Sequence, residues 1–423
     1  MASQPPAAVE QEQLPPIDIK PLLSRMWPVG HPDTVTPEEI ANAISHFFTN
    51  QVSEVQAGSL LMCLHFTGLD RQAEILSKTA AGMLRAAARV DVESLRDVVE
   101  SRGRKEGNYN GGLVDIVGTG GDSHNTFNIS TTSSILASSL LLIAKHGNRA
   151  STSKSGSADL LNCMAPRPPQ ISRIRPDTIS TLYSNTNYGF LFAPVFHPGM
   201  RYVASIRKQL PWRTIFNLLG PLANPTDLVT VGQPSLLEAR MIGVARKDLG
   251  PVFASALQMG GAKKAMVVCG DEELDEISCA GNTHCWLLRP SDEDKSKAVV
   301  ENFLLHPNDF GLPAHPLSEV SPGKEPTENA AILGRILNNE VPDDDPILHF
   351  VLINTAALFV VSGICEAETS DLGYGDDGTV ITERGPGGGR WKEGVRRARW
   401  AIKSGEAARQ WAQFVEVTNS FSE

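Results

Sequence analysis

A strand, a glycine loop and a helix follow one another near residue 113, and this unit constrains the fold more than any other part of the chain. Residues 113–117 form a short apolar run with β-branched side chains, which predicts a strand. The run leads directly into Gly118-Thr-Gly-Gly-Asp122, and residues 130–142 predict a helix that starts with Ser and Thr. Such a unit is typical of a parallel sheet, whose ligands bind at the carboxyl ends of the strands.

The glycine loop predicts an anion site. Three glycines in four positions let the backbone turn tightly and bring its N–H groups against a bulky anion without interference from Cβ atoms. The N-terminus of the following helix adds the positive end of a dipole. We therefore expect a phosphate or pyrophosphate here, although such a loop taken alone could serve only a tight connection.

Two polar segments downstream favour the anion site. The side chains of Asn128, Ser130 and Thr131 can cap the helix and contact a ligand, with a plain helix cap as the alternative. Residues 145–159 place three cations and five hydroxyls in fifteen residues, directly after a predicted strand. A solvated basic loop would explain the charge, but it would not explain the small and hydroxyl residues between the cations.

The pattern along the chain predicts two domains. Two capping boxes, at Thr36 and Ser53, and a third helix over residues 71–88 indicate an all-α start. From residue 111 onward, predicted strands (113–117, 141–144, 228–231, 265–269 and 283–288) alternate with predicted helices that include 234–249 and 250–259. We expect an α/β fold, in which an N-terminal all-α domain precedes a larger α/β domain with a mainly parallel central sheet flanked by helices.

The domain boundaries expected from this pattern are a disordered tail over 1–14, a helical domain over 15–108 and an α/β domain over 109–423. Residues 188–212 are expected to join the helical domain. Residues 289–345 are polar and contain prolines, which predicts a surface excursion.

Charge and composition restrict the classes of partner. The net charge of −10 argues against a nucleic acid or an anionic membrane as partner. The longest apolar run, residues 347–365, contains His349 and Asn354, so we expect a buried helix rather than a membrane span. Six scattered cysteines without a C-x-x-C spacing, and no leader-like segment in residues 1–19, predict reduced thiols in a cytoplasmic protein.

Taken in order, these motifs resemble those of the anthranilate phosphoribosyltransferase family. The resemblance covers about residues 36–359, and several matches in the right order make coincidence improbable. The matching segments are Gly118–Asp122, Asn128–Thr131, Lys145–Arg149, Ser155–Asp159, Phe192–Pro194, His197-Pro198, Arg207, Arg213–Pro225 and Asp275–Ser278.

The resemblance implies an activity and a cofactor. Members transfer the 5-phosphoribosyl group from 5-phosphoribosyl 1-diphosphate (PRPP) to the amine of anthranilate, which gives N-(5-phosphoribosyl)anthranilate and diphosphate in tryptophan biosynthesis. It also implies Mg²⁺ as cofactor and a homodimer.

The resemblance further implies the site residues, and none of them is assigned as a general acid or base. The expected PRPP contacts are Gly118, Gly121, Asp122, Thr126, Asn128, Ile129, Ser130, Thr131, Lys145, Asn148, Ser153 and Ser157. The expected anthranilate contacts are Gly118, Asn148, His197 and Arg207, and the expected metal ligands are Ser130, Asp275 and Glu276.

Two other functions are weighed against this one. A pyrimidine nucleoside phosphorylase has a similar glycine turn, but the chain lacks its Ser-Gly-Arg-Gly-Leu-type and His-Thr-Gly-Gly-Thr-type segments, and the Asp275-Glu276 pair also disfavours it. A non-catalytic relative that binds nucleic acid would need a basic face and a broken metal pair, whereas this chain is acidic and keeps the pair.

Overall fold

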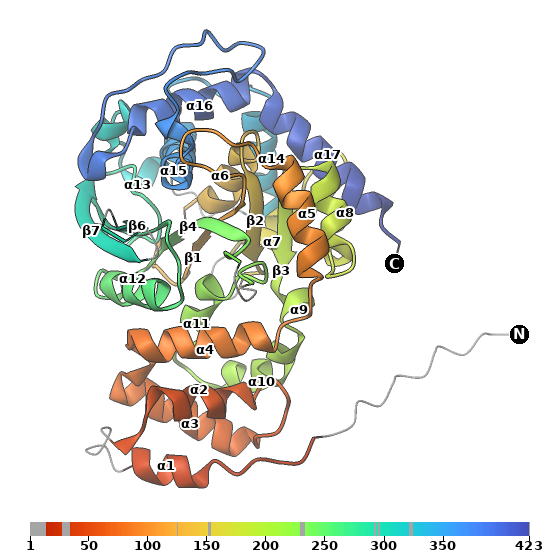
Figure 1. Ribbon diagram of the computed structural model, residues 1–423, viewed down its shortest axis with the longest axis vertical. Coiled ribbons are helices and arrows are strands. Elements are labelled where there is room, and N and C mark those ends of the chain that lie inside the picture. Colours follow the sequence, from red (N-terminus) through yellow and green to blue (C-terminus); the bar gives the residue numbers. More distant parts are fainter. Residues whose placement is uncertain are drawn as a thin grey trace, which may run out of the picture.

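The chain folds into a helical domain and a larger α/β domain, which lie at the bottom and the top of Figure 1. The computed structural model describes residues 14–27, 34–124, 126–150, 154–228, 233–291, 293–294, 297–320 and 325–422. Residues 1–13 of the expected tail lie outside this range.

The helical domain contains α1 (Lys20–Met26), α2 (Pro37–Ser45), α3 (Glu54–Thr67) and α4 (Ala73–Arg85), and α10 (Arg201–Gln209) packs on α3. The predicted capping box at the start of α2 is present, because the Thr36 hydroxyl accepts from the Glu39 N–H and the Glu39 carboxylate accepts from the Thr36 N–H. Helix α4 runs along the junction of the two domains (Figure 1) and packs on α12 (Leu249–Met259) of the α/β domain. The two domains therefore share a hydrophobic core across this junction.

A seven-stranded sheet forms the centre of the α/β domain, in the order β3-β2-β1-β4-β5-β6-β7. Strands β1 to β5 are parallel, and β6 and β7 are antiparallel additions at one edge. The prediction of a mainly parallel sheet is thereby confirmed. Because β1 lies between β2 and β4, the strand order reverses at β1, and its glycine loop lies at the topological switch point where such sheets bind ligands. The strands are β1 (Leu113–Gly118), β2 (Leu142–Gly147), β3 (Tyr188–Phe192), β4 (Leu237–Gly243), β5 (Ala265–Gly270), β6 (Thr283–Pro290) and β7 (Ala298–Leu305).

Helices cover the sheet, and α15 (Pro346–Ser362) is the most buried of the long ones. It packs against β4, α6 (Ile129–Ala137) and α16 (Trp391–Lys403), which explains its largely apolar sequence. No helix in the described part of the chain has the length and apolar character needed to cross a membrane. The remaining α-helices are α5 (Val92–Arg102), α6 (Ile129–Ala137), α7 (Ser157–Asn162), α8 (Ile179–Asn185), α9 (Ala193–Phe196), α11 (Phe216–Leu219), α13 (Leu317–Val320), α14 (Pro326–Leu337), α16 (Trp391–Lys403) and α17 (Glu406–Ser420). Short 3-10 turns are η2 (Leu69–Arg71), η3 (Ile171–Arg173), η4 (Pro198–Met200), η5 (Gly220–Leu222), η6 (Pro307–Phe310), η7 (Ile364–Glu366) and η8 (Pro386–Gly388).

The prediction of a helix over residues 234–249 is wrong, because this stretch contains β4. Its Leu, Glu, Ala, Arg and Met residues favour a helix, but pairing on both sides with β1 and β5 overrides that local preference. Of the strand predicted over 228–231, Leu228 is irregular and the other residues lie outside the described range. Strand β3 was not predicted, and it belongs to the sheet. The return of the chain to the helical domain therefore starts after β3, and not at residue 188.

Residues 289–345 are more than the expected surface excursion. Strand β7 pairs along the whole length of β6, and α14 buries Leu333 and Ile336 in the core of the α/β domain. The polar composition of the segment reflects its exposed face, whereas its few apolar residues are enough to anchor it.

Candidate active site

A cavity of about 480 Å³ opens at the carboxyl ends of β1 and β2. The glycine loop, the start of α6, the segment after β2 and the acidic loop after β5 surround it. The structure thus brings together most of the residues that the sequence suggested. Those that line the cavity are Gly118, Gly121, Asp122, Thr126, Asn128, Ile129, Ser130, Lys145, Asn148, Ser157, Asp275 and Glu276.

Three expected site residues, Thr131, His197 and Arg207, do not line this cavity. Thr131 is buried behind it, and its hydroxyl donates to the Ser157 hydroxyl at 2.9 Å. His197 is also buried, with its ring centroid 5.1 Å from that of His146 in the cavity wall. The Arg207 guanidinium of α10 lies 5.9 Å from the centroid of the Phe216 ring. Ser153 lies outside the described residues.

Two glycines at strand ends allow the acidic loop to cross over the sheet. A Cβ atom on Gly118, at the end of β1, would lie 2.3 Å from Asp275 Oδ2, and one on Gly243, at the end of β4, would lie 1.6 Å from the Asp275 carbonyl oxygen. The Gly120 N–H donates to Asp275 Oδ2 at 2.6 Å. The Asp275 carboxylate is therefore hydrogen-bonded to the glycine loop itself. A side chain at position 118 or 243 would collide with Asp275 and prevent this contact.

A buried amide holds the other side of the acidic loop. Asn354 of α15 donates from Nδ2 to the Ile277 carbonyl oxygen and accepts from the Ile277 N–H at Oδ1, both at 3.0 Å. Asn354 thus fixes both the backbone N–H and the carbonyl oxygen of Ile277, the residue that follows Glu276. From the sequence alone, Asn354 is only a polar residue that argues against a membrane-spanning helix, and nothing predicts its contact with the acidic loop.

Three carboxylates converge on the cavity. Burial and the negative charge of Asp275 raise the pKa of Asp122 to about 8. Burial, and then the charge of Asp275, raises the pKa of Glu276 well above its usual range, although Lys145 opposes this shift. The carboxylates therefore lie in a site that favours an added cation.

The donor set fits Mg²⁺. Within the described ranges, no group of three or more His, Cys, Asp or Glu side chains is arranged to hold a metal by itself. Mg²⁺ needs no such cage, because it is usually held by one or two carboxylates and keeps waters and substrate phosphates as ligands. Adjacent carboxylates from Asp275 and Glu276, in a cavity with a phosphate-type loop, meet that requirement.

Lys145 supplies buried positive charge at the floor of the cavity. Its side chain is almost fully enclosed, and Nζ donates to the Ile116 carbonyl oxygen at 2.7 Å and lies 3.5 Å from the Ser130 hydroxyl. Burial lowers the pKa of Lys145, whereas the charges of Asp115 and Glu276 raise it. The ammonium group therefore lies at a fixed position beside the carboxylates of Asp275 and Glu276.

Sequence reasoning gave no role to two residues of the cavity wall. The Arg213 guanidinium donates to the carbonyl oxygens of Gly120, at 2.6 Å, and Thr119, at 2.8 Å, and so fixes the glycine loop from outside. Asn329 reaches the cavity from α14. Arg213 begins one of the matching motifs, whereas a single Asn within a polar segment carries no sequence signal.

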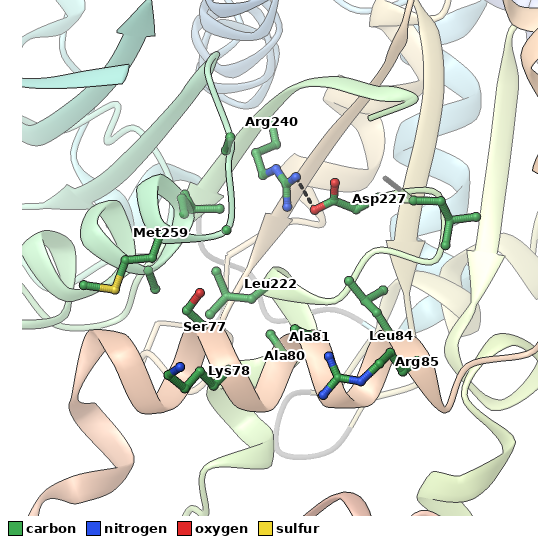
Figure 2. Close-up of a pocket in the computed structure, with 15 residues that line it drawn as sticks. Ser77, Lys78, Ala80, Ala81, Leu84, Arg85, Leu222, Asp227, Arg240 and Met259 are labelled. Atoms are coloured by element: carbon green, nitrogen blue, oxygen red, sulfur yellow. Dashed lines mark hydrogen bonds and ion pairs between the residues drawn. The ribbon is translucent and has the colours of Figure 1, made fainter. Parts of the chain in front are cut away.

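A second cavity, of about 560 Å³, lies at the junction of the domains. Figure 2 shows Lys78 and Arg85 of α4 on one side, and on the other the ion pair of Arg240 with Asp227, whose nitrogen and oxygen are 2.5 Å apart. This cavity has neither a glycine loop nor a pair of carboxylates, and Asp227 already neutralises Arg240. The chemistry of phosphate binding therefore favours the first cavity.

Comparison with known proteins identifies the family of this chain. Residues 22–87 match the model of a glycosyl transferase family, helical bundle domain, and residues 110–408 match that of a glycosyl transferase family, a/b domain. The anthranilate phosphoribosyltransferase of Schizosaccharomyces pombe is 37% identical over 382 residues, which cover 90% of this chain and 92% of the relative. That of Stenotrophomonas maltophilia (strain K279a) is also 37% identical, over 73% of this chain and 76% of the relative.

Solved structures agree with the sequence relatives. Anthranilate phosphoribosyltransferase from Saccharomyces cerevisiae, in complex with PRPP and Mg, superposes with a TM-score of 0.74 at 30% identity, over 94% of this chain and 97% of that chain. The same yeast enzyme in complex with 4-fluoroanthranilate also gives a TM-score of 0.74, at 29% identity over 95% of this chain and 99% of that chain. Sequence, domain pair and fold agree, and this chain belongs to the anthranilate phosphoribosyltransferase family.

Proposed function

We propose that the cavity at the carboxyl ends of β1 and β2 is where this chain transfers the 5-phosphoribosyl group of PRPP to the amine of anthranilate. The observation that carries the proposal is the hydrogen bond from the Gly120 N–H of the glycine loop to the Asp275 carboxylate, with Glu276 next to Asp275 in the same cavity. A loop for phosphates and a pair of carboxylates for Mg²⁺ thus share one cavity. The S. cerevisiae enzyme, which the chain resembles over nearly its full length, is known with PRPP and Mg bound.

The reaction requires that a leaving group be neutralised. The bond from ribose C1 to the diphosphate oxygen breaks, diphosphate departs with the electron pair, and the amine nitrogen of anthranilate bonds to C1 and then loses a proton. Positive charge develops on the ribose ring and negative charge on the diphosphate. Asp275, Glu276 and the Ser130 hydroxyl would hold Mg²⁺, whose charge would neutralise the departing diphosphate. We assign no residue as the acceptor of the amine proton.

The protein's own groups hold the rest of PRPP. The glycine loop, Gly118–Asp122, lines the cavity and would approach the diphosphate closely because its glycines carry no Cβ atom, while the start of α6 adds the positive end of its dipole. The Thr119 and Gly120 N–H groups already donate to the Gly243 carbonyl oxygen and to Asp275. Lys145 contributes a compact charge to phosphate oxygens, and the polar side chains of Asn128 and Ser157 complete the cradle around the sugar phosphate. Fixed donors of this kind need no reorganisation as charge develops.

Anthranilate needs a group that binds its carboxylate, and Arg207 suits that role because a guanidinium grips a carboxylate with two parallel hydrogen bonds. Arg207 lies on α10, which packs with the helical domain, and it does not line the cavity. We therefore propose that the helical domain closes toward the glycine loop when the substrates bind, which also excludes water. Asn148 lies in the cavity wall as a further contact, and His197 supports that wall through His146.

We also propose a homodimer that forms through the helical domain. Val55, Met62 and Phe66 lie on one face of α3 and are 79%, 40% and 64% exposed. Three large apolar side chains at positions i, i+7 and i+11 form a stripe that a second copy can bury. A cytoplasmic location is proposed as well, since all six cysteines are free thiols.

The test follows the fluorescence of anthranilate in the presence of PRPP and Mg²⁺. The wild-type protein is expected to consume anthranilate only with Mg²⁺, and the double variant Asp275→Ala/Glu276→Ala is expected to be inactive. Asp271→Ala serves as the matched control, because this carboxylate on the same loop is exposed and pairs with Lys247. Arg207→Ala is expected to raise the KM for anthranilate more than that for PRPP. If the wild type does not consume anthranilate, the proposal is wrong, and phosphorolysis of nucleosides is the next activity to assay.

A further inference from the structure

We propose that Asn329 of α14 is a positioning residue for PRPP, because it fixes the side-chain amide of Asn128 in the orientation that binds the substrate. This inference rests on the proposed function, in which Asn128 contacts the sugar-phosphate part of PRPP.

The contact joins two distant parts of the chain at the cavity. Asn329 Nδ2 donates to Asn128 Oδ1 at 2.9 Å, across 201 positions of sequence. Asn329 is 2% exposed, and both residues line the cavity. Helix α14 also packs on α7, which begins at the cavity residue Ser157, so α14 is held firmly beside the site. Asn329 thus points at the substrate cradle from a well-packed element.

The hydrogen bonds of the Asn128 amide determine which way it points. Its Oδ1 accepts from Asn329 Nδ2, at 2.9 Å, and from the Ser155 hydroxyl, at 3.0 Å, while its Nδ2 donates to the Ser155 carbonyl oxygen at 3.0 Å. An amide has an acceptor and a donor end, and a flip of 180° would place the Asn128 NH₂ against the NH₂ of Asn329. Of the two Nδ2 hydrogens, one is used by Ser155 and the second can donate to an oxygen of PRPP.

Two substitutions at position 329 are expected to impair PRPP binding to different degrees. In Asn329→Ala the Asn128 oxygen loses one of its two donors, so the amide is held less firmly. In Asn329→Asp a carboxylate oxygen faces the Asn128 oxygen, which favours the flipped amide and turns an acceptor toward the phosphate oxygens. Asn329→Asp should therefore be the more damaging of the two variants, although it differs least from the natural side chain in shape.

The experiment measures kcat and the KM values for PRPP and for anthranilate in the full-length protein. One lost hydrogen bond corresponds to a rise of about 3- to 10-fold in the KM for PRPP of Asn329→Ala. The KM for anthranilate is expected to stay at the wild-type value, which a general loss of structure would not produce. Asn338→Ala, at the exposed C-terminal end of the same helix, is the matched control and should behave as the wild type. Asn329→Ser keeps a small polar residue that is too short to reach Asn128, and it replaces Asn329→Ala if that variant does not fold.

A double-mutant cycle with Asn128→Ala tests whether Asn329 acts through Asn128. The proposal expects Asn128→Ala to raise the KM for PRPP, and Asn329→Ala to add nothing in that background. Additive effects, or a wild-type KM in Asn329→Ala while Asn128→Ala is impaired, would overturn the inference and leave the proposed function intact. A wild-type KM for PRPP in Asn128→Ala would instead remove Asn128 from the substrate contacts, and the inference would fall with that assignment.

Discussion

Substitution of the two central glycines of the loop separates backbone conformation from packing. Gly120 and Gly121 have positive φ values of +63° and +80°, so an alanine at either position costs about 1 kcal/mol of backbone strain. A Cβ atom on Gly120 would meet nothing within 4 Å, whereas one on Gly121 would lie 1.2 Å from Arg213 Nη1. Gly121→Ala must therefore displace the guanidinium that donates to Gly120 and Thr119.

The displaced guanidinium sets the expected difference between the two variants. A hydrogen bond from a charged donor contributes about 1.5–3 kcal/mol, so the loss of one of the two lowers stability by about 2 kcal/mol beyond the strain. We expect Gly120→Ala to lower the free energy of unfolding by about 1 kcal/mol and Gly121→Ala by about 3 kcal/mol.

Urea unfolding of both variants measures this difference. If the loop must keep its shape in the transition state, the same 2 kcal/mol or so should lower kcat/KM for PRPP about 30-fold more in Gly121→Ala than in Gly120→Ala. The double variant Gly121→Ala/Arg213→Ala should be less stable than Arg213→Ala by only the backbone strain, about 1 kcal/mol, because the clash with Arg213 is gone. Equal losses in Gly120→Ala and Gly121→Ala would refute the reasoning, since they would mean that Arg213 does not anchor the loop.

Four further predictions concern stability, pH and the metal. Glu393→Gln should lower the free energy of unfolding in urea by about 3 kcal/mol, because Glu393 and Arg397 form a fully buried ion pair at 2.7 Å; a loss below 1 kcal/mol would contradict this. Asp227→Asn leaves the enclosed guanidinium of Arg240 without its partner and should cost about 3–5 kcal/mol in unfolding experiments, at low and high salt alike. Burial lowers the pKa of His197 to about 4, below its usual 6.5, so between these values the unfolded chain binds a proton that the folded chain does not. The free energy of unfolding should therefore be unaffected by this group above pH 6.5 and fall by about 1.4 kcal/mol per pH unit from pH 6.5 to 4. A pH series of unfolding curves should show a weaker pH dependence in His197→Gln. Removal of Mg²⁺ with EDTA should abolish the PRPP-dependent loss of anthranilate fluorescence, because the charge that neutralises the diphosphate is then missing, and Mg²⁺, but not Na⁺, should restore activity.

Local sequence signals predicted the parts of the fold that short-range rules govern. The Thr36 capping box and the glycine loop after residue 117 each depend on a few neighbouring residues, and both are present in the structure. Strand β4 could not be predicted in this way, because its residues favour a helix and only its two neighbouring strands make it extended. The same limit applies to α14, where Leu333 and Ile336 are buried by elements that the local sequence does not reveal.

Residues that hold the site from a distance were the ones that sequence reasoning left without a role. Arg213 contacts the glycine loop across 93 positions, Asn354 contacts the acidic loop across 77, and Asn329 contacts Asn128 across 201. Arg213 begins one of the matching motifs, but no local pattern assigns these contacts to Arg213, Asn354 or Asn329. Their functions depend on which backbone atoms the folded chain brings near, so a pattern of residue types along the sequence cannot reveal them.

The change from parallel to antiparallel pairing explains how the acidic loop reaches the site. Strand β5 ends at Gly270, and β6 begins at Thr283, directly opposite it. In an antiparallel pair the connection starts and finishes at the same end of the two strands, so the whole loop with Asp275 and Glu276 stays at the carboxyl ends of the parallel strands. A parallel sixth strand would have required a crossover that carries the chain back to the amino ends of the strands. The antiparallel edge of the sheet is therefore what keeps the proposed metal carboxylates beside the glycine loop, and the glycines that end β1 and β4 provide the space for them.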